Sequence, residues 1–202
     1  MKSVLAALSL LMFLIASVSA AERFPKLDET DWGWWRGPNH NGIAAASADP
    51  PLIWDDKTNI RWQAEILGRG HSSPSVVGDH VFLTTADEVK QTQHVLCFER
   101  STGDLLWNKE IYQGNFDHNN KKNSFASSSV SCDGEQIYTS FFRDKKILTV
   151  ALTLKGELVW EHVYNGFASH QGFGASPLLY KGMVILAADN KAAGGGLLTA
   201  VN

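Results

Sequence analysis

The sequence has little cysteine, little net charge and no helix-forming stretch beyond its N-terminus. Only two of its 202 residues are cysteine, and no histidine pair stands beside them, so the ligand spacing of a zinc site is missing. A formal net charge of −3 provides no basic surface for nucleic acid. With 44% hydrophobic and 19% charged residues, the chain is nevertheless typical of a folded protein rather than a disordered one.

The one long apolar run lies at the N-terminus and predicts a secretory signal over residues 1–20. Lys2 supplies the positive charge, residues 4–18 are apolar, and small residues at Val18 and Ala20 predict cleavage before Ala21. The alternative is an uncleaved anchor, but a spanning helix needs about 20 apolar residues. No cysteine follows the cleavage point, which argues against a lipoprotein. We therefore expect a periplasmic or extracellular protein that meets the membrane only through its cleaved signal.

An exported chain could join its two cysteines in a disulfide. Cys97, however, lies within an apolar strand pattern, and Cys132 lies beside a predicted turn. Because cysteine is among the residues most often buried, we predict two free thiols and keep the disulfide as the alternative.

What the sequence does contain is an internal repeat. The stretch from Ser72 to Trp107 is followed by a similar one from Ser127 to Trp160, and a third begins at Ala175. Trp62, Trp107 and Trp160 close successive units and stand 45 and 53 residues apart. Units of this length with several short strands predict an all-β fold, a β-propeller in which each repeat forms one four-stranded blade.

Turn residues divide each repeat into short strands. In the first unit we expect strands over residues 76–77, 81–85, 95–98 and 105–111. Thr102-Gly103 predicts the hairpin before the last strand, and Lys155-Gly156 does the same with one residue fewer, since glycine tolerates positive φ. The Trp rings are expected to wedge between neighbouring blades. A strand is also expected around residues 59–66, as the outer strand of the last blade supplied from the N-terminus.

These motifs resemble the pyrroloquinoline-quinone-like propeller repeat of exported bacterial proteins, a group that includes the outer-membrane assembly propeller. The motif residues are Cys97, Glu99, Thr102, Gly103 and Trp107, then Ala151, Gly156 and Trp160, with Ala200 opening a third copy. The Trp-rich stretch 32–42 is similar to the segment before the first blade. The resemblance implies a ring of seven or eight blades, of which about three partial blades are present, so that the chain would end halfway round. It divides the chain into a signal (1–20), a Trp-rich leader (21–58) and a partial propeller (59–202).

The resemblance implies two kinds of protein. Some members are dehydrogenases that hold pyrroloquinoline quinone and calcium beneath a disulfide of adjacent cysteines, and others are binding scaffolds. This sequence has no adjacent cysteines. We therefore predict a non-catalytic scaffold that binds protein partners, with neither quinone nor calcium. The alternatives are a quinone-dependent alcohol dehydrogenase and a polysaccharide-binding module in which Trp32, Trp34 and Trp35 stack on sugars; packing against the propeller is the expected role of these three rings.

Candidate site residues gather where the inner strands begin. His71, His170 and Gln171 are expected near the mouth of the central channel, where two histidines could share a metal or simply bond to loop backbone. The serines that recur at these positions have no Gly-x-Ser-x-Gly elbow, so we interpret them as small residues that let the inner strands crowd together. Loops 117–120 and 189–191 carry oxygen ligands without a calcium-binding pattern and are interpreted as solvated loops.

Overall fold

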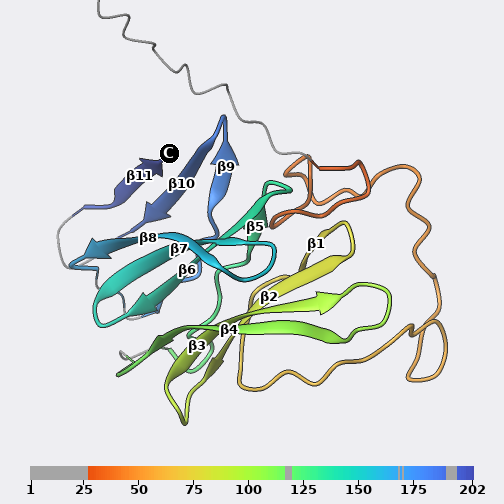
Figure 1. The fold of residues 1–202 in the computed structure, drawn as a ribbon, viewed down its shortest axis with the longest axis horizontal. Coiled ribbons are helices and arrows are strands. Elements are labelled where there is room, and N and C mark those ends of the chain that lie inside the picture. The colour runs from red at the N-terminus through yellow and green to blue at the C-terminus, as the bar shows by residue number, and fades with distance from the viewer. Residues whose placement is uncertain (1–26, 117–119, 168, 170, 190–194) are drawn as a thin grey trace, which may run out of the picture.

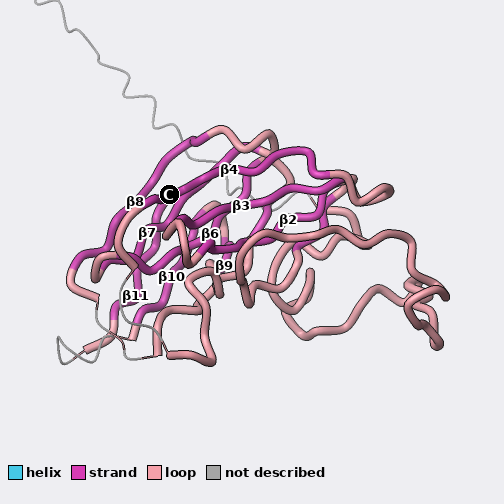
Figure 2. Tube along the Cα trace, turned by 90° about the horizontal axis from the view of Figure 1, so that it is seen from below, coloured by secondary structure: helices cyan, strands magenta, loops and turns pink. Residues whose placement is uncertain are grey.

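The computed structural model describes residues 27–116, 120–167, 169, 171–189 and 195–202. The predicted signal and its cleavage before Ala21 lie outside these residues. Within them the chain consists of strands and loops, as Figure 2 shows, and no described segment is a helix able to cross a membrane. The strands form three antiparallel sheets that follow one another along the chain (Figure 1), which confirms the all-β propeller-blade prediction.

The first sheet, called blade 1, has the order β1-β2-β3-β4. Its strands are β1 (Ser75–Val77), β2 (His80–Asp87), β3 (Thr92–Glu99) and β4 (Leu105–Gln113). Gly78 and Gly103 end β1 and open β4 with φ of 54° and 79°, a conformation in which a Cβ would be strained. Val, Phe, Thr and Leu fill β2 and β3, which have neighbours on both edges and are mostly buried.

The second sheet, blade 2, repeats this plan in the order β5-β6-β7-β8. Its strands are β5 (Ser131–Cys132), β6 (Gln136–Arg143), β7 (Lys146–Thr153) and β8 (Leu158–Asn165). Asp144 and Lys145 both have positive φ, as a two-residue hairpin turn between β6 and β7 requires. Gly156, with φ of 81°, makes the shorter hairpin predicted before β8.

The third sheet, blade 3, has three described strands in the order β11-β10-β9. They are β9 (Leu178–Tyr180), β10 (Met183–Ala188) and β11 (Leu197–Val201). In the two complete blades a fourth strand pairs with the third. Strand β11 pairs with β10 along one edge, and no described strand pairs with its other edge.

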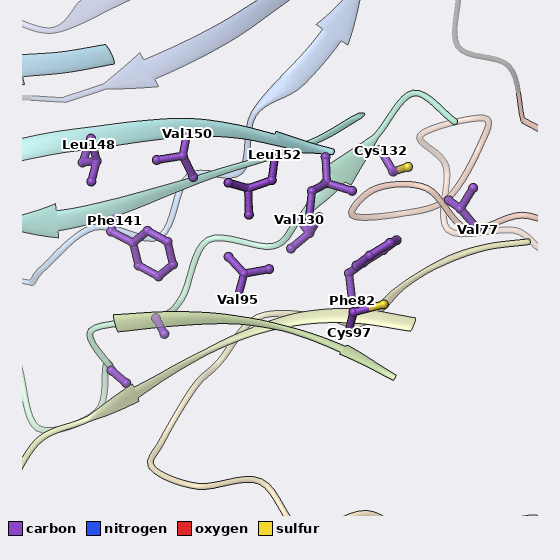
Figure 3. Close-up of a cluster of buried hydrophobic side chains, with 13 residues drawn as sticks. Val77, Phe82, Val95, Cys97, Val130, Cys132, Phe141, Leu148, Val150 and Leu152 are labelled. Atoms are coloured by element: carbon purple, nitrogen blue, oxygen red, sulfur yellow. The ribbon is translucent and has the colours of Figure 1, made fainter. Parts of the chain in front are cut away.

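Apolar side chains fill the spaces between successive blades. Figure 3 shows Phe82, Val95 and Cys97 of blade 1 facing Val150 and Leu152 of blade 2, all at most 1% exposed. A second cluster joins blade 2 to blade 3; its members are Phe142, Ile147, Tyr164, Phe167, Phe173, Leu186 and Ala188. The blades therefore stack face to face around their apolar side chains, as propeller blades do.

The strand expected at residues 59–66 is absent from the described structure. The segment passes alongside blade 1 and has no ladder hydrogen bonds. A strand needs a partner that supplies donors and acceptors, and no described strand stands on the outer side of this segment. Before it, residues 43–60 form a loop that projects from the sheets (Figure 1, orange).

Candidate functional site

The tryptophans of the repeat contact glycines in the next unit. The indole N–H of Trp62 donates to the carbonyl of Arg100 at 2.8 Å, and a Cβ added at Gly103 would lie 2.5 Å from the Trp62 ring. Trp107 repeats the arrangement one blade later: its N–H donates to the Leu154 carbonyl at 3.0 Å, and its ring covers Gly156. The glycines therefore serve twice, because they open the hairpin and they leave room for the ring of the preceding unit.

Trp160 contacts an aromatic ring of its own blade as Trp107 does, but the other side of its ring is more open. Its ring lies 6.0 Å from that of Tyr138, just as Trp107 lies 6.1 Å from Phe82. No described hairpin of blade 3 covers it as Gly156 covers Trp107. Instead Trp160 lines a pocket of about 160 Å³ together with Leu179 and Asn202.

Serines at the inner strands join the blades by hydrogen bonds. Ser75 Oγ donates to the Val130 carbonyl at 2.5 Å, and Ser131 Oγ donates to the Pro177 carbonyl at the same distance. One step earlier, the N–H of Ser73 donates to Ser129 Oγ, and the N–H of Ser129 donates to Ser176 Oγ. Sequence reasoning interpreted Ser73, Ser129 and Ser176 as small spacers and did not single out Ser75 or Ser131, so it missed this role. Their hydroxyls are bound to backbone, which leaves no activated nucleophile among them.

The loops that precede the inner strands form a surface across three units, which we call the rim surface; it comprises residues 66–71, 120–124 and 171. Gln171 accepts from Asn120 Nδ2 at 2.8 Å through its side chain and from Asn123 Nδ2 at 2.6 Å through its backbone carbonyl. Arg69 donates to the Lys121 carbonyl at 3.0 Å. The blades are therefore tied together at this rim, and the side chains of Gln171 and Arg69 remain exposed.

The predicted channel-mouth residues are only partly tested. His71 is exposed, and its backbone N–H donates to the Ala126 carbonyl at 2.9 Å. Gln171 lies on the same rim surface, and His170 lies outside the described residues. A metal shared by the two histidines stays untested, and among the described residues no three His, Cys, Asp or Glu side chains converge on one point.

Comparison with known families matches residues 19–164 to the family model described as outer membrane protein assembly factor BamB. The match covers the leader, blade 1 and almost all of blade 2. This chain belongs to the BamB family. The match confirms the resemblance drawn from the Trp-closed repeat, and it agrees with the sheets of the structure. Comparison with curated proteins finds no match.

The BamB-family match includes the Trp-rich leader, and the leader lies against both complete blades. Trp32 exchanges backbone hydrogen bonds with Val76 at 2.7 and 2.9 Å, and the Gly33 carbonyl accepts from the N–H of Cys132 at 2.7 Å. Trp34 is buried and stacks on His40, and Trp35 is 57% exposed. Trp34 packs as expected, whereas Trp35 does not.

Both cysteines of this BamB-family chain are free, as predicted, and both are fully buried. Removal from water raises the pKa of Cys97 to about 12, with a smaller contribution from the nearby Glu99 carboxylate. Burial likewise raises the pKa of Cys132 to about 12. Thiols held in the protonated form are poor nucleophiles and poor metal ligands, so these two residues serve packing.

Proposed function

We propose that this protein is an exported, non-catalytic scaffold that binds other proteins in the periplasm or outside the cell. Membership of the BamB family supports this, because the name of that family's model describes an outer membrane assembly factor. The predicted signal over residues 1–20 supports export. Sequencing of the exported protein from its N-terminus is expected to begin at Ala21, and recovery of Met1 would contradict cleavage.

The observation that carries the proposal is the rim surface. Loops from successive units are fixed side by side by hydrogen bonds that cross from one to the next, so binding would order little additional backbone. Lys121 and Lys122 are exposed beside Arg69. Cationic and amide donors on a preformed surface suit a protein segment rich in carboxylates and free carbonyls.

The same surface and the inner strands favour binding over redox chemistry. Strands β1, β5 and β9 carry Ser, Val, Cys, Leu and Tyr, and no carboxylate, so they provide neither a base for a substrate proton nor acidic oxygens for calcium. We therefore keep the proposal that no quinone is bound.

Site-specific photocrosslinking tests the scaffold. A photoreactive residue at Lys122 is expected to capture one defined protein in the producing cell, whereas the same residue at Glu161, an exposed position on β8, is expected not to. Lys121→Glu in the chain that carries the photoreactive residue at position 122 should abolish the capture without unfolding the chain. Equal capture from both positions would contradict a rim-specific partner, and quinone binding with calcium-dependent alcohol oxidation would replace the scaffold by the dehydrogenase.

A further inference from the structure

Arg143 is a cation without an ion-pair partner at the junction of blades 1 and 2. It ends β6 and is half-buried, and it forms no ion pair with a described residue. Arg69 on the same rim, by contrast, lies 3.8 Å from the Glu88 carboxylate. Lys146, at the start of the next strand, lies 3.1 Å from that of Asp144. A charge partly removed from water with no counter-charge is costly, so the placement of Arg143 needs an explanation.

The guanidinium group of Arg143 is held over the ring of Tyr112. Its central carbon lies 4.3 Å from the ring centroid, which is the geometry of a cation–π contact. Tyr112 belongs to β4, so this contact crosses from blade 1 to blade 2. Nε of Arg143 is enclosed and has no acceptor, and its terminal nitrogens form no hydrogen bond with the described residues. The guanidinium is therefore fixed in position while its terminal donors remain unused.

A buried glutamine fixes the backbone that carries Arg143. Gln93 is fully buried, and its Nε2 donates to the Phe142 carbonyl at 3.1 Å and to the Phe125 carbonyl at 2.7 Å. Phe142 directly precedes Arg143, and Phe125 directly follows residues 120–124 of the rim surface. One side-chain amide thus joins β3, β6 and the rim loop. This arrangement places Arg143 at the border of the rim surface.

The next junction between blades lacks this polar arrangement. Gln93 pairs with Tyr112 at the start of β3, and Ile147 pairs with Tyr164 at the equivalent place in β7. Ile147 is fully buried in the apolar cluster between blades 2 and 3. An apolar residue is therefore sufficient where this position only packs two blades together. The buried Gln93 and the unpaired Arg143 depart from the repeat, and such departures are expected at functional sites.

We propose that Arg143 binds a carboxylate of the partner protein and so anchors an Asp or Glu side chain on the rim surface. A guanidinium offers parallel N–H donors that match the two oxygens of a carboxylate, and the Tyr112 ring holds these donors in place. Phe116 and Phe125, half-buried and stacked at 4.3 Å, offer apolar contact to the rest of the segment. The inference rests on the scaffold function proposed above and names the chemical group that the surface recognises.

Capture in the producing cell gives the first test. With the photoreactive residue at position 122, Arg143→Gln and Arg143→Lys are each expected to lower the yield of captured protein about tenfold, because lysine keeps the charge but not the paired donors. Arg100→Gln is the matched control, since Arg100 donates to the Gly78 carbonyl at the opposite ends of the strands. It should leave the yield unchanged. If the chain with Arg143 intact captures nothing, the scaffold function itself fails.

Binding of the captured segment then tests the carboxylate. The cross-linked segment is synthesised as a peptide, and a second peptide has every Asp replaced by Asn and every Glu by Gln. The unmodified chain should bind the second peptide about tenfold more weakly, and Arg143→Gln should remove most of that difference. Tyr112→Leu should reduce the difference in part, whereas Tyr112→Phe keeps the ring face and should preserve it. Isothermal titration calorimetry measures the affinities.

Three results would overturn the proposal. The first is equal capture of one defined protein with and without Arg143→Gln. The second is an unchanged difference between the two peptides in Arg143→Gln together with a lower melting temperature, because Arg143 would then serve folding alone. The third is flotation with vesicles of phosphatidylglycerol and phosphatidylcholine that is lost in Arg143→Gln, because the bound group would then be a lipid phosphate.

Discussion

The interface between blades 1 and 2 and the interface between blades 2 and 3 place a Trp and an aromatic ring at equivalent positions, but among the described residues a hairpin covers the Trp only at the first. Trp107 lies under the Gly156 hairpin and donates to the Leu154 carbonyl, whereas Trp160 lines an open pocket. The ring contacts on the inner side, to Phe82 and Tyr138, are nearly identical. The comparison shows that a blade positions its own Trp ring, and that the next blade contributes the covering.

The largest test of this comparison replaces the two rings. Trp107→Ala is expected to lower the free energy of unfolding by about 3–5 kcal/mol, since it removes a large side chain packed on both sides. Trp160→Ala should cost about 1–2 kcal/mol, because one side of its ring lines a pocket and no described hairpin covers it. Urea denaturation measures both. Equal losses would show that the described contacts of Trp160 hold its ring as firmly as the Gly156 hairpin holds that of Trp107.

Adding a methyl group beneath the Trp rings, by replacing Gly103 or Gly156 with Ala, is expected to give the next largest loss of stability. Gly103→Ala should cost about 2–3 kcal/mol, because the left-handed φ alone costs about 1–2 kcal/mol and the new Cβ would lie 2.5 Å from Trp62. Gly156→Ala should cost about 1 kcal/mol less, since its Cβ would lie 3.0 Å from Trp107. Gly78→Ala is the control, because its φ is positive and nothing lies within 4 Å. A loss at Gly103 no larger than at Gly78 would refute the ring contact.

One serine hydrogen bond stands at the inner end of each interface, from Ser75 between blades 1 and 2 and from Ser131 between blades 2 and 3. Ser75→Ala and Ser131→Ala are each expected to cost about 1–2 kcal/mol, because each leaves a buried carbonyl without its donor. Ser101→Ala serves as the control, since that hydroxyl donates to an exposed Glu99 carboxylate and should change stability by less than about 0.5 kcal/mol. Thermal unfolding ranks the three variants. A negligible loss at both positions would show that these two hydrogen bonds do not hold the blades together.

The buried thiols should leave the free energy of unfolding independent of pH near neutrality, and should make it fall measurably with rising pH in alkali. In the folded state both pKa values are raised from the usual 9.0 to about 12, so the unfolded chain loses these protons first as pH rises. Stability from this source is complete below pH 9 and falls between pH 9 and about 12. The double variant Cys97→Ala, Cys132→Ala should show a flatter decline over that range in urea titrations. An unchanged slope would mean that the thiols reach solvent.

The fold could be predicted from the sequence, and so could the Trp and Gly positions that make the contacts between blades, but not which Trp contacts which Gly. The strands, both hairpin glycines and the Trp positions could be predicted because they depend on neighbours within a few residues. The partners of the rings could not, because Trp62 and Gly103 meet only after a whole blade has folded between them. The serine bonds left a usable signal: Ser73 and Ser75 recur as Ser129 and Ser131 with the same offset. Hydroxyl direction, however, is set by the stacking of blades and not by local sequence.

Residues 59–66 show a case in which the sequence predicted a strand that the structure does not form. Its pattern is that of a strand, and sequence reasoning assigned one, but a ladder is a property of two segments. The structure shows the same segment extended beside blade 1, and no described strand lies on its outer side. The channel-mouth prediction at His71 and Gln171 gives a similar lesson: both lie on one rim, and what the rim binds depends on a second molecule.

The leader's bonds also fix an order of events during synthesis. Residues 31–33 leave the ribosome early, but the N–H that binds the Gly33 carbonyl belongs to Cys132, which is made 99 residues later. An exported chain folds after it crosses the membrane, so the Gly33 carbonyl can be bound only once residue 132 has followed the leader across. The leader therefore completes its hydrogen bonds to the blades only after the first strand of blade 2 is present.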